Sequence, residues 1–376
     1  MNRITIRIDS LAYRGSGVGR VDNIVYFVPL AAPRELLEIE IVKQEKHFRI
    51  GRIMRIIEPS PYRIEPVCPY FGECGGCNWQ HITYKRQLEE KRNILKDAIT
   101  RIGKIAPEID PVIPSPDIYG YRNRTRLRFA AGGRIGYFAA ESHKLIEIDN
   151  CPILSPEINS FLPRLKSEAA LISPPSGEIE IYLDPEGSVQ HSFVSSSRKA
   201  ALSFSQVNHR VNSLLREKIY ALVADFYLKD KPPVIMDLYC GDGNLSLHLS
   251  GIAGSIEGWD LSAAAIRKAR RNVRKLGLQN VEYKKSDAGR VLAEIDRSGR
   301  SADILIADPP RKGLKGIIPS IVRLEAPIVF YISCVPPILA RDLGELTKAG
   351  YMIKKVIPFD MFPQTFHLET LAVLAR

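Results

Sequence analysis

Apolar and polar residues alternate in short runs along residues 1–60. The apolar positions of these runs are Ile4, Ile6, Ile8, Val25, Phe27, Leu37, Ile39, Ile41, Ile50 and Ile53. Successive side chains of a strand point to opposite faces, so this spacing predicts four or five short strands. The turn sequences RGSGVGR and PLAAPRE separate the runs, and we therefore expect a small, OB-like β-barrel.

Residues 201–376 follow a different rhythm, in which strand-like apolar runs alternate with helical stretches. The strand-like runs are VIMDLYC, SIEGWD, VEYKKSD, ADILIADPP, PIVFYISC and ETLAVLAR. Between them lie stretches with helical spacing of apolar residues, such as LSAAAIRKARRNVRKLG. This alternation predicts an α/β fold, a Rossmann-like parallel sheet with helices on both faces.

The segment between these two units, residues 61–200, is irregular. Its clearest helix is predicted over residues 82–103, where apolar residues recur at helical spacing. In YGYRNRTRLRFA, strand periodicity places the arginines on one face: Arg122, Arg124, Arg126 and Arg128. Such a ladder can follow the phosphates of a nucleic acid, and a solvated strand face explains it equally well.

Length and charge limit the class of protein. A chain of 376 residues exceeds one ordinary core and predicts two or three domains. Lys and Arg number 53 against 42 Asp and Glu, and the net charge of +11 favours a polyanionic partner such as RNA. No apolar run is long enough to span a membrane, and MNRITIRIDS lacks the apolar core of a secretory signal. We therefore expect a cytoplasmic protein without membrane association, and nothing in the sequence requires an obligate protein partner.

The sequence DLYCGDGNLSLHL begins as a strand and opens a helix. Asp237, Gly241 and Gly243 form a D-x-x-x-G-x-G arrangement, which is typical of adenosylmethionine-binding methyltransferases and differs from the dinucleotide pattern. The next three strands also end in acids: Asp260, Asp287 and Asp308. Asp260 is placed to accept the ribose hydroxyls, Asp287 to lie near the adenine amino group, and Asp308 to form the pocket floor. Helix capping is the alternative for any one of them.

Cys334 ends the fifth strand, directly before a pair of prolines. Carbon 5 of a pyrimidine is a poor nucleophile, but a thiolate that adds to carbon 6 activates it. After methyl transfer a base must remove the proton on carbon 5, and the sequence offers His367 and Glu369 just before the last strand. Burial beside an apolar run favours Glu369, because it raises the pKa of a carboxyl group.

Most of the remaining cysteines cluster in VCPYFGECGGCNWQ, which gives Cys68, Cys74 and Cys77 at C-x5-C-x2-C spacing. Cys151 follows at a distance, in DNCP. Such a set can hold either zinc or a [4Fe–4S] cluster, and the spacing alone favours zinc slightly as the commoner structural metal.

Together these motifs resemble the RNA (uracil-5-)-methyltransferase family, in particular its 23S ribosomal RNA enzymes with a TRAM domain and an iron–sulfur cluster. The resemblance spans nearly the whole chain, and FSQVN, SCVPPILARD and FPQTFHLET are similar to family motifs. It implies cofactor-binding roles for Gln206, Tyr239, Asn244, Asp260, Asp287 and Asp308. It also implies Cys334 as nucleophile, Glu369 as base, and a [4Fe–4S] cluster in place of zinc on Cys68, Cys74, Cys77 and Cys151.

Some positions depart from the family pattern. Val335 follows the nucleophile where the family usually has Asn, and Pro337 and Ile338 stand where Ala and Thr are usual. The resemblance implies a class I methyltransferase domain over residues 201–376, behind a TRAM-like barrel (1–60) and a small cluster-binding domain (61–200). We therefore predict S-adenosylmethionine-dependent methylation of uridine carbon 5 in RNA. Ribosomal RNA is the first choice of substrate and tRNA the second, and a non-catalytic RNA-binding factor is the alternative from another class.

Overall fold

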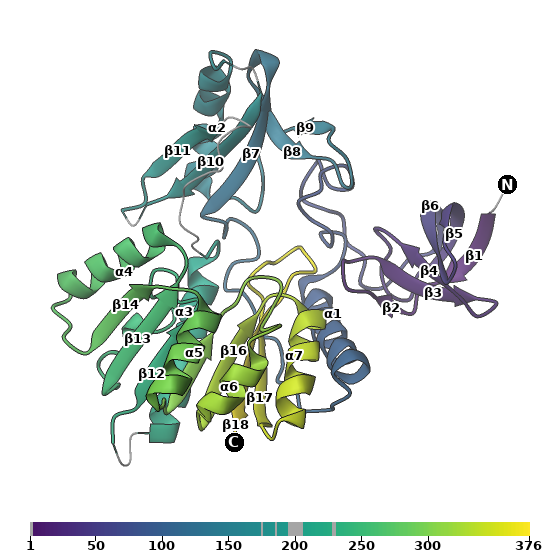
Figure 1. The fold of residues 1–376 in the computed structure, drawn as a ribbon. Coiled ribbons are helices and arrows are strands. Elements are labelled where there is room, and N and C mark those ends of the chain that lie inside the picture. The colour runs from purple at the N-terminus through teal and green to yellow at the C-terminus, as the bar shows by residue number, and fades with distance from the viewer. Residues whose placement is uncertain (1–2, 174–175, 185, 195–205, 228–230) are drawn as a thin grey trace.

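The computed structural model shows the chain as separate lobes, each built around its own β-sheet (Figure 1). The N-terminus lies at the outer end of the first lobe, and the C-terminus follows β18, an inner strand of the largest sheet. The expected domain boundary near residue 201 falls outside the residues that the structure describes. Those residues are 3–173, 176–184, 186–194, 206–227 and 231–376.

The N-terminal sheet curls into a six-stranded barrel of order β1-β5-β6-β4-β3-β2, where the pattern predicted four or five strands. Its strands are β1 (Arg3–Arg7), β2 (Ser10–Leu11), β3 (Gly17–Val21), β4 (Ile24–Val28), β5 (Leu36–Gln44) and β6 (Phe48–Glu58). The alternating residues Ile6, Leu37 and Ile39 meet in its core. A Cβ on Gly19 would lie 2.2 Å from the carbonyl oxygen of Arg7, so a glycine is needed where β3 approaches β1.

The central sheet is antiparallel, with the order β11-β10-β7-β8-β9, and helix α2 packs against it. Its elements are β7 (Arg124–Ala130), η2 (Ala131–Gly133), β8 (Arg134–Phe138), β9 (Leu145–Glu147), α2 (Pro156–Ala169), β10 (Gly177–Leu183) and β11 (Val189–Val194). Cys151 lies in the same hydrophobic core as the apolar faces of β7 and α2, which fixes one cysteine of the predicted metal set within this lobe.

The C-terminal sheet has seven strands in the order β14-β13-β12-β15-β16-β18-β17. They are β12 (Val234–Leu238), β13 (Ser255–Asp260), β14 (Val281–Lys285), β15 (Ile304–Ala307), β16 (Ile328–Ser333), β17 (Met352–Phe359) and β18 (Glu369–Ala375). The doubly wound sheet is confirmed, with two differences, the first being that β17 was not among the six predicted strands. The strands β12 to β16 pair in parallel, whereas β18 runs antiparallel to both β16 and β17.

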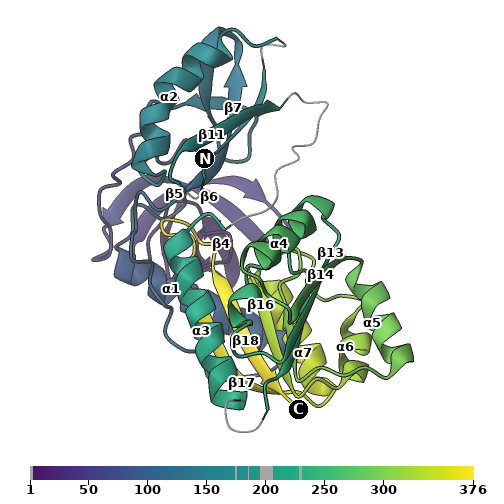
Figure 2. The same cartoon turned by 90° about the vertical axis from the view of Figure 1, so that its left-hand side faces the viewer.

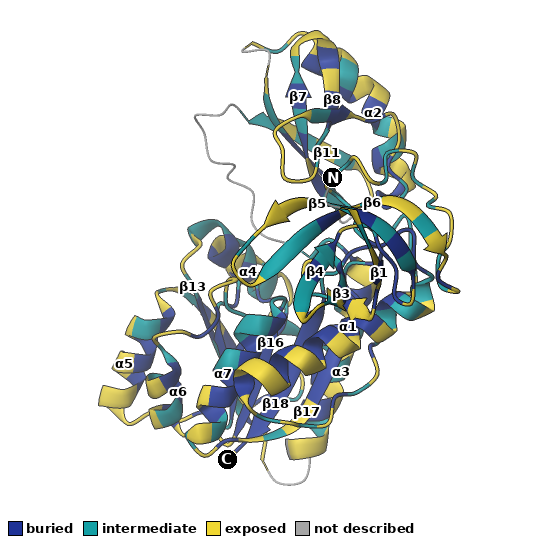
Figure 3. Cartoon of the chain, turned by 90° about the vertical axis from the view of Figure 1, so that its right-hand side faces the viewer, coloured by how far each residue is buried: buried dark blue, intermediate teal, exposed yellow. Residues whose placement is uncertain are grey.

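Helices cover both faces of this sheet, as Figure 2 shows. They are α1 (Tyr84–Ala98) with its continuation η1 (Ile99–Gly103), α3 (His209–Tyr227), η3 (Leu247–Leu249), α4 (Ala263–Lys275), α5 (Ala288–Ser298), α6 (Ile318–Leu324) and α7 (Pro336–Lys348). In Figure 3 the strands β16 and β18 are buried between helices whose outer faces are exposed. Within the described residues, no helix combines the length and apolarity that crossing a membrane requires.

The helix predicted over residues 82–103 is confirmed, but it packs on α7 of the C-terminal unit. Leu95, Ile99 and Val112 belong to the same hydrophobic core as α5, α6 and α7. The backbone of Ile113 also donates a hydrogen bond to Pro358 in β17, with an N–O distance of 2.8 Å. The segment between the barrel and residue 201 therefore contributes to the central core, to the C-terminal core, and to a smaller core in which Trp79, Ile82 and Ile94 meet Leu11 and Ala32.

Candidate active site

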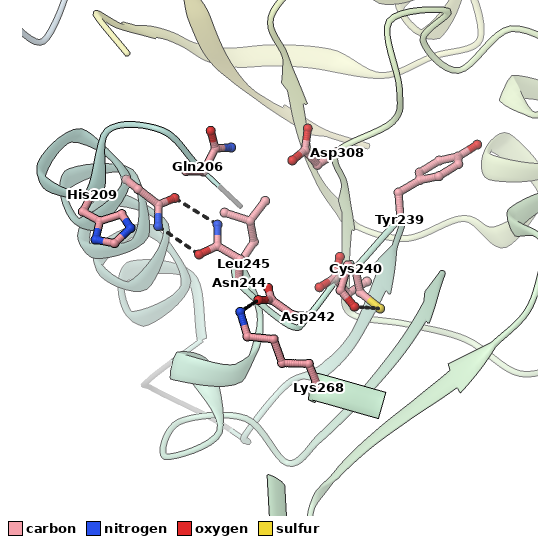
Figure 4. A pocket seen from close by; sticks show the side chains of 12 residues that line it. Gln206, His209, Tyr239, Cys240, Asp242, Asn244, Leu245, Lys268 and Asp308 are labelled. Atoms are coloured by element: carbon pink, nitrogen blue, oxygen red, sulfur yellow. Dashed lines mark hydrogen bonds and ion pairs between the residues drawn. The ribbon is translucent and has the colours of Figure 1, made fainter. Parts of the chain in front are cut away.

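A cavity of about 210 Å³ opens at the carboxyl ends of the parallel strands, around the turn that follows β12. Four of the six predicted cofactor residues line it: Gln206, Tyr239, Asn244 and Asp308. In Figure 4, Gln206, Asn244 and Asp308 face the same space although they come from different elements. Gln206 is the part of the FSQVN motif that lies in the cavity, while Phe204 and Ser205 fall outside the described residues.

The turn after β12 holds the backbone in conformations that most residues avoid. Tyr239 has a φ of +63°, and Gly241 and Gly243 have φ values of +56° and +84°. A Cβ on Gly243 would also lie 2.7 Å from the hydroxyl oxygen of Tyr283. Glycine is therefore required there for both backbone angle and space, and the turn exposes its backbone to the cavity.

Asp260 and Asp287 do not line the cavity. The Asp260 carboxylate accepts hydrogen bonds from the backbone of Gly241 (3.1 Å) and Ser262 (2.7 Å). Asp260 therefore stabilises the turn after β12. Asp287 is the N-cap of α5 and accepts from the backbone nitrogens of Gly289 and Arg290. The capping alternative is thus observed at Asp287, because its side chain lies within reach of the free backbone amides of the first helical turn.

Several cavity residues were missed by sequence reasoning. Asn212 and Asn244 exchange two amide hydrogen bonds of 2.9 Å, and Lys268 forms a 2.6 Å ion pair with Asp242. The spacing of Asn208 and Asn212 was the available signal, since residues four apart share one face of a helix.

Asp237 was noted only as part of the glycine turn, but it is also a buried cavity residue. Burial raises its pKa to about 8, against the opposing effect of the hydrogen bond from Ser246. Its Oδ2 accepts from the Ser246 hydroxyl at 2.5 Å, whereas its Oδ1 has no hydrogen-bond partner. A buried oxygen without a partner at a cavity wall is a natural contact for a polar ligand.

The antiparallel register of β18 brings the predicted nucleophile and base together. Ser333 of β16 pairs with Thr370 of β18, so the next residue on each strand, Cys334 and Glu369, meet at the same edge of the sheet. A parallel last strand would have placed Glu369 at the opposite edge. The structure thus brings together the two residues that the sequence named, although the sequence predicted a parallel last strand.

Like charges and burial hold protons on this pair. The pKa of the Cys334 thiol is raised to about 11, mainly by burial and then by the negative charges of Glu369 and Asp308, while the Arg311 guanidinium opposes the shift. Glu369 is 5% exposed, and burial together with Asp308 raises its pKa well above that of an ordinary carboxyl. The site therefore contains a thiol, a buried acid and a nearby cation in mutual electrostatic contact.

The prolines after Cys334 begin a helix. Pro336 and Pro337 are the first residues of α7, positions where proline is favoured because no intrahelical N–H is lost. Val335 is the N-cap residue and offers no side-chain acceptor to the helix amides. Asparagine is a preferred N-cap, so the departure from the family pattern at this position removes a helix cap.

The loop before β18 is tied to the cysteine-containing segment through Gln364. The carbonyl oxygen of Gln364 accepts hydrogen bonds from the backbone of Asn78 (3.1 Å) and Trp79 (3.0 Å). Its side chain and backbone exchange hydrogen bonds of 2.9 and 3.0 Å with the buried amide of Gln87 in α1. His367 lies in the same loop, and burial lowers its pKa to about 4, so it is neutral at physiological pH.

Cys68, Cys74, Cys77 and Cys151 line one small cavity, although Cys151 is distant in sequence. Burial raises the pKa of Cys77 to about 12. Among the described residues, no three His, Cys, Asp or Glu side chains are close enough to hold a single metal ion. A zinc ion needs all its sulfurs about 2.3 Å from one point, whereas a cluster spreads its thiolates over several irons. Four cysteines around one cavity match in number the thiolates that a [4Fe–4S] cluster binds.

The arginine ladder is present, but most of its charges are already paired. Arg126 forms ion pairs with Glu178 and Glu180 of β10, and Arg128 lies 2.6 Å from Glu178. The guanidinium of Arg124 lies over the ring of Tyr182, with 5.8 Å between the guanidinium carbon and the ring centroid. Arg122 faces the cysteine cavity and does not extend the strand face. Cross-strand acids were not considered in the sequence reasoning, which treated the ladder as one strand.

Comparison with known proteins identifies the family and the fold. Residues 182–376 match the family model described as tRNA (uracil-5-)-methyltransferase. The chain belongs to the RNA (uracil-5-)-methyltransferase family. An uncharacterised RNA methyltransferase of Bdellovibrio bacteriovorus is 34% identical over 99% of this chain and 95% of that protein. The 23S rRNA (uracil(1939)-C(5))-methyltransferase RlmD of Histophilus somni is 28% identical over 99% of this chain and 96% of that enzyme.

A family member of known structure supports the same conclusion. The tRNA (uracil-54, C5)-methyltransferase of Pyrococcus abyssi, solved with S-adenosyl-L-homocysteine, superposes with a TM-score of 0.76 at 26% identity. The match covers 99% of this chain and 100% of that one. The chain is accordingly an enzyme that methylates uracil carbon 5 in RNA with S-adenosylmethionine, as its sequence predicted.

Proposed function

We propose that this enzyme acts through a covalent bond between Cys334 and carbon 6 of a uridine in 23S ribosomal RNA. The observation that carries the proposal is the register of β16 and β18, which sets Cys334 beside Glu369. A methyltransferase acting on nitrogen or oxygen would need neither a thiol nor a buried carboxylate at that edge.

In the first step the Cys334 thiol releases its proton to solvent and the sulfur adds to carbon 6. The electrons of the carbon 5–carbon 6 bond move into the carbon 4 carbonyl, and carbon 5 becomes the nucleophile. The cation of Arg311 supports this step, since it favours the thiolate over the thiol. S-adenosylmethionine supplies the methyl group when bound in the cavity beside Asp308 and Asn244.

In the second step the Glu369 carboxylate accepts the proton of carbon 5. The electrons of that carbon–hydrogen bond restore the carbon 5–carbon 6 double bond and expel the Cys334 thiolate. Glu369 must first release its own proton to solvent; because burial and Asp308 raise its pKa, the ionised carboxylate is then a stronger base than an exposed one. Glu369 would thus finish the reaction that Cys334 begins.

The choice of RNA rests on similarity alone. The relative that acts on 23S rRNA and the solved structure that acts on tRNA both match nearly the whole chain. We favour ribosomal RNA because the chain resembles family members that combine a barrel with the four-cysteine motif. Transfer RNA is the second candidate.

Nucleoside mass spectrometry can decide between the two RNAs. Unmodified 23S rRNA and unmodified tRNA are each incubated with the enzyme and S-adenosylmethionine, with Cys334→Ala as the matched inactive control. We expect 5-methyluridine in the ribosomal RNA, at one or two positions found by digestion. Methylation of tRNA alone would overturn the choice of substrate, and activity of Cys334→Ala would overturn the covalent mechanism.

We also propose that Cys68, Cys74, Cys77 and Cys151 hold a [4Fe–4S] cluster with a structural role. Support comes from the cavity that all four line and from the C-x5-C-x2-C spacing. Anaerobically purified protein should contain about four irons and four sulfides per chain, and Cys77→Ser should lower both. Stoichiometric zinc without iron would contradict this assignment.

The RNA itself is proposed to lie against several basic surfaces. The barrel (1–60) and the central unit (61–200) would hold RNA in front of the methyltransferase unit (201–376). Helix α4 adds a face whose basic side chains are exposed, next to the cofactor cavity: Arg267, Arg271, Arg274 and Lys275. Because Arg126 and Arg128 are paired with acids, α4 should contribute more phosphate affinity than the β7 ladder.

A further inference from the structure

The turn between β2 and β3 belongs to the barrel, but its residues lie outside the hydrophobic core of the barrel. The backbone nitrogen of Ala12 donates to Ser16 (2.8 Å), and that of Gly15 donates to Ala12 (2.9 Å). Arg14, at the tip of this tight turn, has a φ of +80°, a conformation that non-glycine side chains rarely adopt. Such strain is kept only where surrounding structure holds it, so the contacts of the turn are informative.

Those contacts are with the cysteine-containing segment, with α1 and with the loop before β18. The carbonyl oxygen of Gly15 accepts a 3.0 Å hydrogen bond from the indole of Trp79, and the backbone of Leu11 donates to the Glu90 carboxylate at 3.2 Å. A Cβ on Gly15 would lie 3.2 Å from the Trp79 nitrogen and 3.4 Å from the ring of Phe366. The turn is therefore fixed between α1 and the loop that leads to Glu369.

Tyr13 is the aromatic residue of this turn, and its ring meets Phe366. The two ring centroids are 5.4 Å apart, at an interplanar angle of 84°. Phe366 in turn lies 4.2 Å from the ring of His367, with the planes tilted by 35°. Three rings from two distant segments thus form one continuous aromatic surface, three residues before the predicted base Glu369.

This aromatic surface lies within electrostatic range of the nucleophile. The charge of Cys334 contributes to raising the pKa of Tyr13, after burial, whereas Arg14 and Arg311 oppose the shift. The same Arg311 acts on the Cys334 thiol and on His367. The ring of Tyr13 is only partly buried, so one side of it remains available to a ligand.

We propose that Tyr13, carried by the barrel, forms with Phe366 the aromatic wall against which the flipped target uridine is held for attack by Cys334. The inference rests on the proposed carbon 5 methylation and adds the residue that positions its substrate. Enzymes that act on a flipped base commonly stack it against aromatic side chains. The barrel is then part of the active site as well as a surface for RNA.

The test compares full-length Tyr13→Leu and Tyr13→Phe with a matched control in the same barrel. Phe27 pairs with Phe48 at 5.4 Å and 78°, so Phe27→Leu removes an aromatic pair of the same kind away from Cys334. For each protein one measures the melting temperature, the affinity for RNA, and the single-turnover rate of covalent adduct formation at saturating RNA.

We expect Tyr13→Leu to slow adduct formation by about tenfold to a hundredfold, the range for loss of one base-stacking contact. RNA affinity should change by no more than about threefold, because contacts with the RNA phosphates dominate that affinity. Tyr13→Phe should retain most of the rate, and Phe27→Leu should match the unsubstituted enzyme. Leucine fills much of the space of the ring, so the fold is expected to persist.

Two results would overturn the inference. If Tyr13→Leu formed the adduct as fast as Phe27→Leu, Tyr13 would have only a structural role in holding the barrel in place. If Tyr13→Phe formed the adduct as slowly as Tyr13→Leu, the aromatic ring alone would not be what holds the uridine. If the unsubstituted enzyme itself formed no adduct, the proposed covalent mechanism would fail instead, which separates the two claims.

Discussion

The cavity proposed to bind S-adenosylmethionine and the proposed nucleobase side of the active site are assembled in different ways. Every residue that lines the cavity lies between Gln206 and Asp308 in the sequence. The nucleobase side, which we define as Tyr13, Arg311, Cys334, Phe366 and Glu369, draws on segments from both ends of the chain.

The difference teaches which parts of the molecule each function needs. The cavity is formed by one sheet and its own helices, so it depends on the C-terminal unit alone. The nucleobase side depends on contacts between the barrel, the cysteine-containing segment and the loop before β18, which meet at Trp79. Changes on the nucleobase side should therefore impair chemistry while cofactor binding persists.

The largest effect is expected from Cys334→Ala. Loss of the nucleophile should lower methyl transfer by about four orders of magnitude or more, because no other group can activate carbon 5. Affinity for S-adenosylhomocysteine, measured by calorimetry, should stay within about twofold of the unsubstituted value. A variant that still methylates at an appreciable rate would show that the thiol is incidental.

Glu369→Gln should separate the two chemical steps. An amide cannot accept the carbon 5 proton, so turnover should fall by about a hundredfold to ten-thousandfold. Methylated RNA should remain attached to the protein with ordinary uridine, visible as a shifted band on a denaturing gel. Rapid release of methylated RNA by this variant would assign the base role to another residue.

The charges around Cys334 predict a pH dependence. Since the thiolate is the attacking form and its pKa is about 11, the rate of adduct formation should rise about tenfold per pH unit. No plateau is expected below about pH 9 in the absence of RNA-induced changes. Asp308→Asn removes a negative charge that raises this pKa, so its profile should shift to lower pH at saturating cofactor. A plateau near neutral pH in the unsubstituted enzyme would contradict the assigned electrostatics.

Gln364→Ala tests whether the loop before β18 is held by its hydrogen bonds. The substitution removes the side-chain hydrogen bonds of Gln364 with Gln87 and Ile118, while the Gln87 amide keeps its bonds to Trp79, Ile82 and the backbone of residue 364. The free energy of unfolding should fall by about 1 kcal/mol, the net contribution of an ordinary hydrogen bond. Adduct formation should slow by about tenfold through displacement of Phe366 and Glu369. Cofactor affinity serves as the internal control, and an equal loss there would remove the distinction between the two sides.

The smallest effect is expected from Val335→Asn. An asparagine at this position can accept from the free amides at the start of α7, which should raise the free energy of unfolding by about 1 kcal/mol. Chemical denaturation gives the value, and methylation rates should not change. If the variant altered the rate without altering stability, residue 335 would be a substrate contact.

The cofactor side was predictable because its signals are local. The turn after β12 and the acid of Asp308 are recognised from short motifs at strand ends, and parallel strands gather those ends at one edge. Asp287 shows the limit of such reasoning, since capping and cofactor binding need the same residue at the same place.

The nucleobase side was predictable only in part. Cys334 and Glu369 follow from the chemistry, but their meeting depends on the antiparallel direction of β18, which no local pattern encodes. Strand β17 escaped detection because its first half is polar, with Lys354 and Lys355 exposed. The contact of Tyr13 with Phe366 joins positions at opposite ends of the chain, and periodicity carries no information about such pairs.

The most direct test of the covalent mechanism uses RNA that contains 5-fluorouridine. Fluorine on carbon 5 cannot be removed by a base, so the reaction should stop with the RNA bonded to the protein. Peptide mass spectrometry after incubation with S-adenosylmethionine should find the methylated, fluorinated nucleotide on Cys334, and the Cys334→Ala variant should give no adduct. An adduct on another residue, or none from protein that binds both cofactor and RNA, would contradict the account.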